Sequence, residues 1–390
     1  MDITIHPHLL SGTVKAIPSK SVAHRLLICA ALADCETMIE CPEINQDIDA
    51  TADCLRALGA GVTRTESGYR VSPISNAPKS AELYCKESGS TLRFMLPIVG
   101  ALGVDATFHM EGRLPHRPLS PLSEELEKHG CALCRSTPDT IRCTGKLKPG
   151  AYCIDGSVSS QYVTGLMFAV ALLGNASSLM VTGKTESKPY IEMTQRALTL
   201  FDASRYPFRS PGQVRVEGDW SNAAFFLAAK TLGNTVDVCG LLDNSVQGDR
   251  AIFEILNNIQ NIDTIDAADI PDLVPILAVT AGVQKKITFT NIARLRLKES
   301  DRVASVAAML EQLGAQVIVN ENTMTVFPGE FHGCTIDSVG DHRIAMAAAI
   351  AATRASGAVT ILNAQCVAKS YPTFWEEYRR LGGNYEQHIR

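Results

Sequence analysis

The sequence predicts an α/β protein of two domains, each with three repeats that place apolar helices inside and sheets outside. Two observations predict this class. The chain has 390 residues, which at about 150 residues per domain means two domains or one large one. A helix–strand pattern also recurs six times, and six such units exceed one domain of about 150 residues. Three units per domain is therefore the natural division.

Each repeat consists of a short polar motif, an Ala- and Leu-rich apolar segment, a Gly, Asp or Asn, and a β-branched segment. The apolar segments begin near Ser19, Ser88, Ser159, Trp220, Pro271 and His342. The β-branched segments are 37–41, 106–111, 178–183, 235–240, 286–290 and 358–362. Their starts lie 69, 72, 57, 51 and 72 residues apart, so the repeats follow one another along the whole chain.

The apolar segments are typical of helices. In 25–33 nearly every residue is apolar, which predicts a helix buried on all faces. The short segments rich in Ile, Val and Thr predict strands. Second helices, expected within 53–62, 124–133 and 309–317, close most repeats, and each is followed by a strand. The glycines after Leu58 and Leu313 are expected in the left-handed conformation that ends a helix.

The composition excludes several classes of protein. Hydrophobic residues make up 46% and charged residues 20%, an ordinary globular balance. The net charge of −5 provides no general basic field for nucleic acid or anionic membrane. The longest apolar stretch, 165–174, is half of the about 20 residues that a membrane span needs, and the N-terminus has no signal-peptide core. We therefore expect a cytoplasmic protein that binds neither nucleic acid nor membrane.

Metal and cofactor motifs are missing from the sequence. Of the 12 cysteines, only Cys131 and Cys134 form a C-x-x-C pair, and no second pair stands at zinc-site spacing. There is no H-E-x-x-H, no G-x-G-x-x-G and no Walker A loop. We therefore expect free thiols, no metal and no cofactor.

Polar motifs open the apolar helices, and several carry positive charge. If helices of like direction pack together, their free N–H groups converge into an anion site. Each motif alone is explained as a cap or a solvated helix face. Their joint occurrence in six repeats favours a site for a compact polyanion. The basic residues near helix ends are Lys20, Arg25, Arg93, Arg117, Lys298, Arg302, Arg343 and Lys369.

The same motifs resemble those of a known family. The segments SKSVAHRLLICAALAD, ESGSTLR, GRLPHRP, DGSVSSQYVTGLM, SKPYIEMT, VEGDWSNAAFFLAA, QGD, DIPDLVPILA, KESDR, GDHRIAMA and CVAKSYP occur in this order. Together, over about Thr4 to Gly383, they resemble the enolpyruvylshikimate-phosphate synthase (3-phosphoshikimate 1-carboxyvinyltransferase) family. The resemblance implies a two-domain inside-out α/β barrel of the enolpyruvyl transferase type, with six βαβαββ-type units. It implies that residues 1–18 plus 218–390 form domain 1, that 19–217 form domain 2, and that the active site lies in the interdomain cleft.

The resemblance also implies substrates and residue roles. The enolpyruvyl group of phosphoenolpyruvate would pass to the 5-hydroxyl of shikimate 3-phosphate through a tetrahedral intermediate, in a monomer without metal or cofactor. The residues implied for shikimate 3-phosphate are Lys20, Ser21, Arg25, Ser159, Ser160, Gln161, Ser187, Tyr190, Asp272 and Lys298. Those implied for phosphoenolpyruvate are Lys20, Gly89, Arg93, Arg117, Gln161, Arg302, Arg343 and Lys369. Those implied for catalysis are Asp272, Lys20, Glu299 and His342.

The chemistry fits these residue types. Each substrate carries a carboxylate and a phosphate, and arginine binds both groups through paired donors. The attacking hydroxyl loses a proton and carbon 3 of phosphoenolpyruvate gains one, which requires a base and an acid. The sequence leaves open which of Lys20, Glu299 and Asp272 moves which proton. Glu87 and Arg294 depart from the family pattern and affect expected affinities more than the reaction.

Two other functions stay open at this point. One is the same transfer to UDP-N-acetylglucosamine, but enzymes of that type usually carry a cysteine in the loop that corresponds to 112–117, which here reads GRLPHR. The other is a non-catalytic anion-binding paralogue or an RNA-processing protein built from related repeats. The acidic net charge disfavours RNA, and the presence of Lys20, Asp272 and Glu299 disfavours a paralogue without activity.

Overall fold

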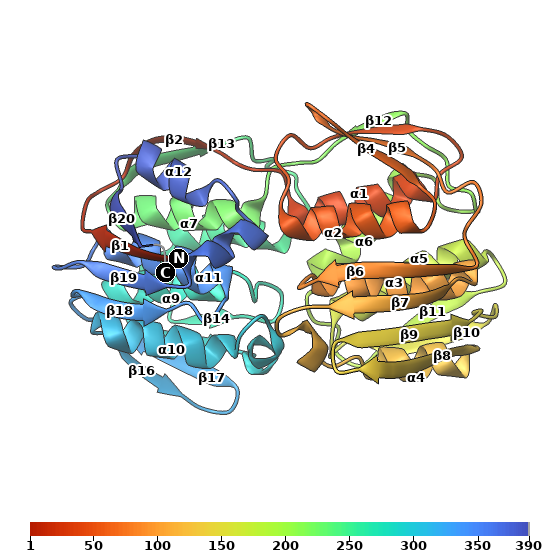
Figure 1. The fold of residues 1–390 in the computed structure, drawn as a ribbon. Helices are drawn as coiled ribbons and strands as arrows, with labels where there is room; N and C mark the ends of the chain where they lie inside the picture. Colours follow the sequence, from red (N-terminus) through yellow and green to blue (C-terminus); the bar gives the residue numbers. More distant parts are fainter. Residues whose placement is uncertain (389–390) are drawn as a thin grey trace. The chain divides into compact units, whose positions relative to one another are not determined.

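The computed structural model describes residues 1–388, which divide into two compact units. The split unit comprises Met1–Ile17 and Gly218–Arg390, and the continuous unit comprises Pro18–Glu217. Each unit has its own hydrophobic core, and in each the sheets lie outside and the apolar helices inside (Figure 1). The predicted α/β class is confirmed, although the sheets formed by residues 1–388 are open and do not close into a barrel.

In the continuous unit, three apolar helices form the interior. They are α1 (Lys20–Ala31), α3 (Gly89–Leu102) and α5 (Ser160–Leu173). The other helices are α2 (Gln46–Ala57), α4 (Leu122–Lys128), α6 (Lys188–Leu200) and the 3₁₀ turn η1 (Leu114–His116). The strands are β3 (Thr37–Glu40), β4 (Gly61–Thr65), β5 (Gly68–Ser72), β6 (Ser80–Lys86), β7 (Asp105–Met110), β8 (Cys131–Thr137), β9 (Thr140–Gly145), β10 (Ala151–Asp155), β11 (Ser178–Thr182) and β12 (Gln213–Arg215).

The split unit repeats this plan. Its interior helices are α7 (Trp220–Thr231), α9 (Val274–Gln284) and α11 (His342–Ala352). The other helices are α8 (Ala251–Asn257), α10 (Arg302–Leu313), α12 (Phe374–Arg380), η2 (Gly248–Arg250), η3 (Ile259–Asn261), η4 (Ala293–Leu297) and η5 (Ala364–Lys369). The strands are β1 (Asp2–His6), β2 (Ser11–Lys15), β13 (Thr235–Cys239), β14 (Thr264–Asp266), β15 (Ile287–Thr290), β16 (Gln316–Val319), β17 (Thr323–Phe327), β18 (Cys334–Asp337), β19 (Val359–Leu362) and β20 (Asn384–His388).

One strand pattern explains all six sheets. Four sheets have four strands, in the orders β12-β3-β5-β4, β6-β7-β9-β8, β14-β15-β17-β16 and β18-β19-β1-β20. In each, the first two strands are parallel and the remaining pairings are antiparallel. The other two sheets, β10-β11 and β13-β2, contain the parallel pair alone. The six predicted repeats are therefore six copies of one α/β unit, two of which lack the antiparallel pair.

The strand pairing also shows why one unit is made of two chain segments. Strand β2, before the continuous unit, pairs in parallel with β13, which follows it; the register runs from Ser11 opposite Thr235 to Lys15 opposite Cys239. Strand β1 lies between β19 and β20. The first residues of the chain are therefore held by strands more than 200 residues further on.

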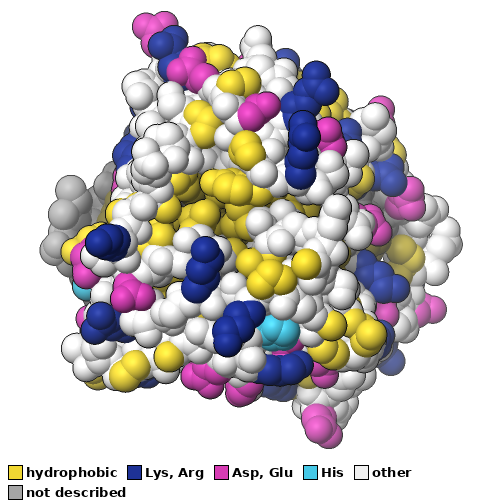
Figure 2. Space-filling model, turned by 90° about the vertical axis from the view of Figure 1, so that its right-hand side faces the viewer, with side chains coloured by type: hydrophobic (Ala, Val, Ile, Leu, Met, Phe, Trp, Pro, Cys, Tyr) yellow, Lys and Arg dark blue, Asp and Glu magenta, His cyan; other side chains and the backbone are white. Residues whose placement is uncertain are grey.

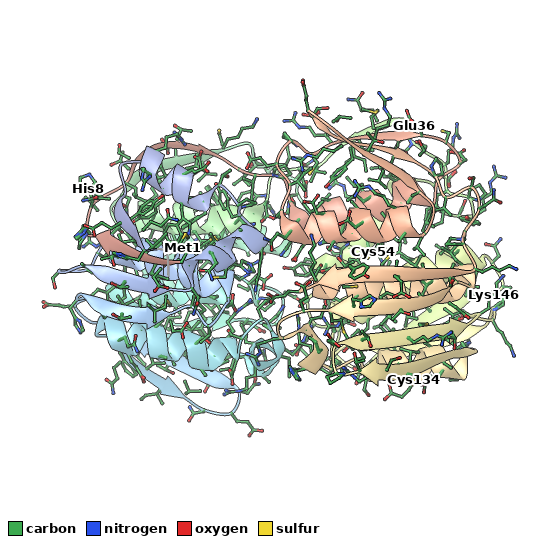
Figure 3. The ribbon with its side chains drawn as sticks, in the orientation of Figure 1. Met1, His8, Glu36, Cys54, Cys134 and Lys146 are labelled. Atoms are coloured by element: carbon green, nitrogen blue, oxygen red, sulfur yellow. The ribbon has the colours of Figure 1, made fainter. Side chains whose placement is uncertain are left out.

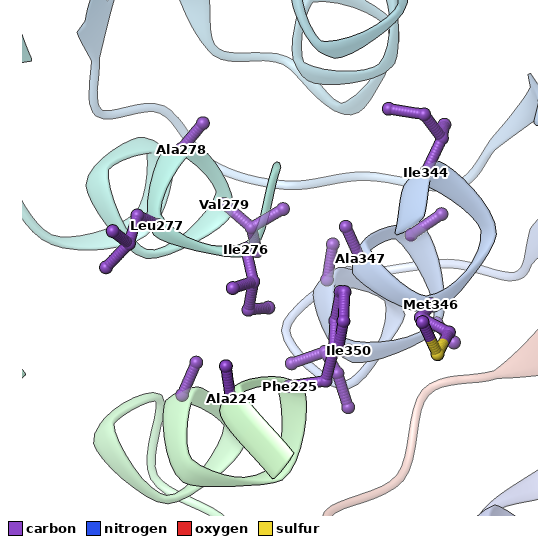
Figure 4. Packing of buried hydrophobic residues seen from close by; sticks show 14 of the residues in the cluster. Ala224, Phe225, Ile276, Leu277, Ala278, Val279, Ile344, Met346, Ala347 and Ile350 are labelled. Atoms are coloured by element: carbon purple, nitrogen blue, oxygen red, sulfur yellow. The ribbon is translucent and has the colours of Figure 1, made fainter. Parts of the chain in front are cut away.

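The interior helices are largely buried because most of their residues are apolar. Burial is complete in α11, from His342 to Ala352, whereas α5 keeps a partly exposed face toward its C-terminus. Side chains of α7, α9 and α11 face one another in the core, among them Phe225, Ile276 and Ile350 (Figure 4). A buried helix leaves backbone groups without intrahelical partners only at its ends. Charged side chains are accordingly concentrated near the ends of these helices and in the loops beside them.

The predicted elements are confirmed, with shifts at their ends. The six predicted strands are β3, β7, β11, β13, β15 and β19, each within one residue of its predicted start. The expected second helices start earlier than predicted; α2 begins at Gln46 because the Asn45 side chain accepts from the Ile48 N–H and caps it. Helix α9 begins at Val274, three residues after Pro271. Gly59 and Gly314 have φ of 97° and 109°, as predicted.

The surface and the thiols agree with the composition. On the face shown in Figure 2, Lys and Arg side chains alternate with Asp and Glu around a hollow lined by apolar side chains. All 12 cysteines are free; Cys134 is exposed on β8, whereas Cys54 is buried on α2 (Figure 3). Within residues 1–388, no helix combines the length and the apolar character needed to cross a membrane.

Helices α3 and α5 approach so closely that Gly165 cannot carry a side chain. A Cβ at Gly165 would lie 2.3 Å from the backbone oxygen of Arg93 and 3.0 Å from Pro97 Cγ. We therefore predict that Gly165→Ala lowers the free energy of unfolding by about 1–3 kcal/mol, because a helix backbone must move. Urea denaturation measures the loss. Gly150→Ala is the control, because its Cβ would meet the side-chain ring of His129 at 3.2 Å rather than a helix backbone. Equal stability of the two variants would contradict the prediction.

Candidate active site

Arg25 is a buried cation surrounded by neutral oxygens. Its Nε donates to Thr194 Oγ1 at 2.8 Å, and its Nη1 donates to the Ser21 carbonyl at 2.6 Å. Its Nη2 donates to the Tyr190 carbonyl at 2.8 Å and to Thr164 Oγ1 at 3.3 Å. Among residues 1–388, no carboxylate lies within ion-pair distance of it, and burial lowers its pKa to about 10. Such a guanidinium gains most from an anionic ligand.

Two further guanidinium groups meet at the N-terminus of α3. A Cβ at Gly89 would lie 2.5 Å from Arg93 Nη1 and 2.9 Å from Arg117 Nη1. Only glycine therefore allows both groups to lie against the first turn, where free N–H groups also favour an anion. Arg93 Nη2 donates to the Pro118 carbonyl at 3.2 Å, which ties this helix to the loop that carries Arg117.

Gln161 connects the helix ends of the second and third repeats. Its Oε1 accepts from Arg93 Nη1 at 2.9 Å, and its Nε2 donates to Ser90 Oγ at 3.0 Å. The side chain of Ser159 caps α5 by accepting from the Gln161 N–H at 3.2 Å, and Ser160 is buried beside it. The predicted SSQ motif therefore joins the N-termini of α3 and α5.

The remaining predicted residues of the continuous unit lie around α1 and α6. Lys20 forms an ion pair with Asp47 of α2 at 2.9 Å, and both side chains are less than one fifth exposed. Ser187 is buried just before α6 with φ of 55°, a left-handed conformation that costs a non-glycine residue roughly 1–3 kcal/mol. Tyr190 follows in the first turn of α6, where its carbonyl accepts from Arg25. The continuous unit thus brings its predicted residues together at helix N-termini.

In the split unit, Asp272 is held by three cations. Its Oδ1 accepts from Arg302 Nη1 at 2.7 Å, and Lys298 Nζ lies 3.7 Å away. Its Oδ2 accepts from Arg343 Nη2 at 3.0 Å. Burial alone would raise the pKa of Asp272, but Arg343, Lys298 and Arg302 together hold that pKa well below its usual range. The carboxylate is therefore ionised and able to accept hydrogen bonds.

Arg302 is the centre of this network. Its side chain is 0% exposed and contacts Asp272, Glu299 at 2.6 Å and Asp341 at 3.1 Å. Although burial disfavours the charged form, Asp341, Glu299 and Asp272 raise the pKa of Arg302 above its usual value. Asp341 is itself buried; it caps α11 through the Arg343 N–H at 3.0 Å and accepts from Ser300 Oγ at 3.0 Å. The network therefore fixes the starts of α10 and α11.

The other predicted residues of the split unit surround these groups. Burial lowers the pKa of Lys298 to about 8, although Asp272 opposes the shift. The Glu299 side chain is 30% exposed, and His342 is buried as the first residue of α11. Lys369 Nζ donates to the Gly340 carbonyl at 3.1 Å, in the loop before α11. Each predicted residue of this unit therefore lies at or near the starts of α10 and α11.

Three acids of these clusters were not among the predicted site residues. Asp47 pairs with Lys20 from 27 positions away, and Asp341 is the N-cap of α11. Asp249, in the QGD segment, is fully buried; burial and Asp272 raise its pKa to about 7. The QGD and DHR segments gave a sequence signal for the last two, whereas nothing in the sequence pairs Asp47 with Lys20.

Comparison with solved structures defines the class of protein. The fold resembles an EPSP synthase from Acinetobacter baumannii, with a TM-score of 0.79, 24% identity and 99% of each chain covered. It also resembles the enolpyruvyl transferase NikO from Streptomyces tendae, with a TM-score of 0.77, 18% identity, and 100% and 99% of the two chains covered. The fold is therefore that of the enolpyruvyl transferases.

Sequence comparison then identifies the family. Residues 5–378 match the family model of EPSP synthase (3-phosphoshikimate 1-carboxyvinyltransferase). The 3-phosphoshikimate 1-carboxyvinyltransferase of Clostridium kluyveri is 37% identical, over 99% of this chain and 98% of its own. That of Clostridium beijerinckii is 35% identical over the same shares. The chain belongs to the EPSP synthase family, which confirms the predicted family and the predicted enzyme class.

Removal of Arg302 should leave the buried Asp341 carboxylate without its cation, whereas Asp272 keeps Arg343 and Lys298. We predict that Arg302→Met costs about 3–5 kcal/mol of stability at pH 7. A buried carboxyl that has lost its cation favours the protonated form, so it takes up a proton in the folded state at a higher pH than in the unfolded chain, where protonation occurs near about pH 4. The loss of stability is therefore full at pH 7 and becomes smaller as the pH falls and the folded protein takes up this proton. Urea denaturation at pH 5, 6 and 7 measures the trend.

Arg296→Met is the matched control for this prediction. Arg296 pairs with Asp301 at 3.3 Å in the same segment, but both side chains are more than one third exposed. Its loss should cost less than about 1 kcal/mol at every pH. Two results would show that the carboxylates do not depend on this cation. One is a loss of stability in Arg302→Met that does not change with pH, and the other is a loss no larger than that in Arg296→Met.

Proposed function

We propose that this enzyme transfers the enolpyruvyl group of phosphoenolpyruvate to the 5-hydroxyl of shikimate 3-phosphate, releasing phosphate. The observation that carries the proposal is membership of the family along the whole chain, with the family motifs gathered at helix N-termini in each unit. Both substrates are polyanions, and both units present buried cations at those termini. The reaction belongs to the route that forms chorismate and the aromatic amino acids.

In this proposal the continuous unit binds the phosphate of shikimate 3-phosphate. Arg25 is the main candidate, because it is buried and no carboxylate within the described part of the chain pairs with it. Lys20 and Ser21 lie on the same helix, and Ser159, Ser160, Gln161, Ser187 and Tyr190 are proposed to complete the site. Gly89, Arg93 and Arg117 are proposed to receive phosphoenolpyruvate, since two guanidinium groups meet there over a helix N-terminus.

The split unit is proposed to supply the proton chemistry. Asp272 is the proposed acceptor for the 5-hydroxyl proton, because three cations keep it ionised. Lys298 is proposed to contact shikimate 3-phosphate, and Arg343 and Lys369 to contact phosphoenolpyruvate. The N–H groups of Arg302 donate to Asp272, Glu299 and Asp341. Because these donors are already used, the contact of Arg302 with phosphoenolpyruvate stays a prediction. Glu299, His342 and Lys20 are the remaining candidates for moving a proton.

The proposed reaction has two steps. The 5-hydroxyl oxygen attacks carbon 2 of phosphoenolpyruvate as the hydroxyl proton leaves to a base and carbon 3 gains a proton from an acid. The tetrahedral intermediate then loses phosphate from carbon 2 and a proton from carbon 3, which forms the enol ether. Cations near the phosphate stabilise the charge of the leaving group.

We propose that the two units act on one pair of substrates, in a cleft that closes around them. The support is that the proposed ligands of each substrate come from both units. Closure of this kind assembles a site and excludes water. One chain supplies all the proposed groups, so a monomer suffices. We also propose that the enzyme acts in the cytoplasm, where its twelve free cysteines stay reduced.

The direct test is phosphate release from phosphoenolpyruvate with each acceptor in turn. We predict release with shikimate 3-phosphate and no release with UDP-N-acetylglucosamine. Lys20→Met should lower kcat/KM by about 100-fold or more, because charge stabilisation and proton transfer are worth that much. Lys128→Met, which removes an exposed lysine of α4, should leave activity unchanged. Phosphate release with UDP-N-acetylglucosamine alone would show that the enzyme uses the nucleotide sugar instead. Binding of shikimate 3-phosphate without phosphate release would indicate a paralogue without catalysis.

The proposal also gives a pH dependence for shikimate 3-phosphate. Lys298 has a pKa of about 8, so its charge is present below that pH and is lost above it. We predict that kcat/KM for shikimate 3-phosphate falls as the pH rises through about 8. Lys298→Arg keeps the charge and should remove this alkaline limb, even if it lowers the plateau. Rates from pH 6.5 to 9.5 measure both profiles, and the same limb in Lys298→Arg would exclude Lys298 as its cause.

A further inference from the structure

A chain of buried hydrogen bonds connects three helices of the continuous unit. His24 of α1 contacts Thr51 of α2, with 2.7 Å between Nδ1 and Oγ1. Thr51 contacts Thr91 of α3 at 2.8 Å between the two Oγ1 atoms, and Thr91 Oγ1 donates to Ser88 Oγ at 2.7 Å. All four side chains are at most 1% exposed. None of them is among the residues proposed to bind substrate.

Counting the available protons gives this chain of hydrogen bonds a single donor-to-acceptor direction. Thr91 Oγ1 donates to Ser88 Oγ at 2.7 Å and also lies 3.5 Å from the Asp47 carbonyl, which can only accept, so the single hydroxyl proton of Thr91 is directed to this side. Thr91 must then accept from Thr51, which uses the proton of Thr51. Thr51 can therefore only accept from His24, so Nδ1 carries the ring proton. His24 Nε2 has no hydrogen-bond partner within residues 1–388, which fits an unprotonated nitrogen in an apolar place.

The surroundings of His24 hold the ring in this neutral form. Phe94 contacts it edge to face, with ring centroids 6.3 Å apart. Burial and the charges of Lys20 and Arg25 lower the pKa of His24 well below its usual value. The ring is therefore a fixed hydrogen-bond donor whose charge does not change at neutral pH.

The chain of hydrogen bonds ends at Ser88, next to the place where an anion is proposed to bind. Ser88 is the N-cap of α3, and its Oγ accepts from the Thr91 N–H at 3.3 Å as well as from the Thr91 hydroxyl. Gly89 follows directly, with the guanidinium groups of Arg93 and Arg117 against it. A cap sets the direction of the first turn and of its free N–H groups. The series of donors that ends at this cap thus begins at His24, on another helix.

We infer that His24 is a positioning residue for the phosphoenolpyruvate end of the site, acting through Thr51 and Thr91 on the Ser88 cap of α3. The inference rests on the proposed function, because phosphoenolpyruvate is the ligand proposed for this turn. Loss of the His24 donor lets both threonine hydroxyls rotate, and the cap of α3 loses its fixed partner. The effect should therefore fall on the binding of phosphoenolpyruvate and spare shikimate 3-phosphate.

Two amide variants of His24 test this inference. His24→Asn places an amide N–H near the position of Nδ1, whereas His24→Gln places it near Nε2, where no partner is found in the described structure. We expect His24→Gln to raise KM for phosphoenolpyruvate by about three- to tenfold, the value of one hydrogen bond. His24→Asn should stay within about twofold of the wild type. In both variants kcat and KM for shikimate 3-phosphate should change little.

A second pair of variants is independent of the histidine. Thr51→Ser keeps the hydroxyl and loses a methyl group, whereas Thr51→Val keeps the shape and loses the hydroxyl. Thr51→Val should raise KM for phosphoenolpyruvate as His24→Gln does, and Thr51→Ser should not. If all four variants lose thermal stability and kcat together, with no change in KM for phosphoenolpyruvate, these hydrogen bonds only support the core and the inference is wrong.

The tautomer gives a readout that needs no activity. In protein labelled with ¹⁵N-histidine, the ring nitrogen shifts of His24, assigned by the signal missing in His24→Asn, should show a proton on Nδ1. A proton on Nε2 would reverse the chain and overturn the inference. Failure of the proposed function is distinguishable, because the wild type would then release no phosphate with shikimate 3-phosphate. A wild type that releases phosphate, with His24→Gln and His24→Asn kinetically alike, would overturn this inference alone.

Discussion

Burial of the interior helices is the constraint on which the rest of the structure depends. Helix α11 is buried from His342 to Ala352, and all of its residues after Arg343 are apolar. Charged side chains are therefore concentrated near the helix ends, where backbone N–H and C=O groups are also free; Arg25, Arg93 and Arg343 all lie in the first two turns of their helices. Because the three interior helices of each unit start close together, their positive ends add to one another, and the motifs that open these helices supply the charged side chains.

The two units differ in how their buried charges are compensated. In the split unit, the charged groups contact one another: Lys298, Arg302 and Arg343 surround Asp272, and Arg302 reaches two further acids. Removal of one member reduces the charge compensation of the buried groups that it contacts, which is costly in a buried site. In the continuous unit, Arg25 is enclosed by hydroxyl and carbonyl oxygens. The first arrangement fixes the Asp272 carboxylate in place, and the second leaves the charge of Arg25 without a carboxylate among the described residues.

The sequence predicts the elements better than it predicts their contacts. Six apolar helices and the strands after them follow from composition and period, which are local properties. The start of α2 was missed because the cap at Asn45 lies among polar residues before the apolar period begins. Contacts between distant residues have no such signal. Asp272 and Arg302 are 30 positions apart, and Thr51 and Thr91 are 40 apart, so their pairing follows only from the fold.

Arg25 and Arg302 show why the environment is needed to assign a role. Both are arginines near the start of a helix, both are buried, and the family motifs suggest a ligand for each. Burial without a carboxylate lowers the pKa of Arg25 to about 10, whereas three carboxylates raise that of Arg302 above its usual value. An anion near Arg302 would therefore compete with acids already in place, whereas an anion near Arg25 would meet only neutral oxygens. This difference is why we propose Arg25 for binding the substrate phosphate, while Arg302 holds Asp272 and the starts of α10 and α11 in position.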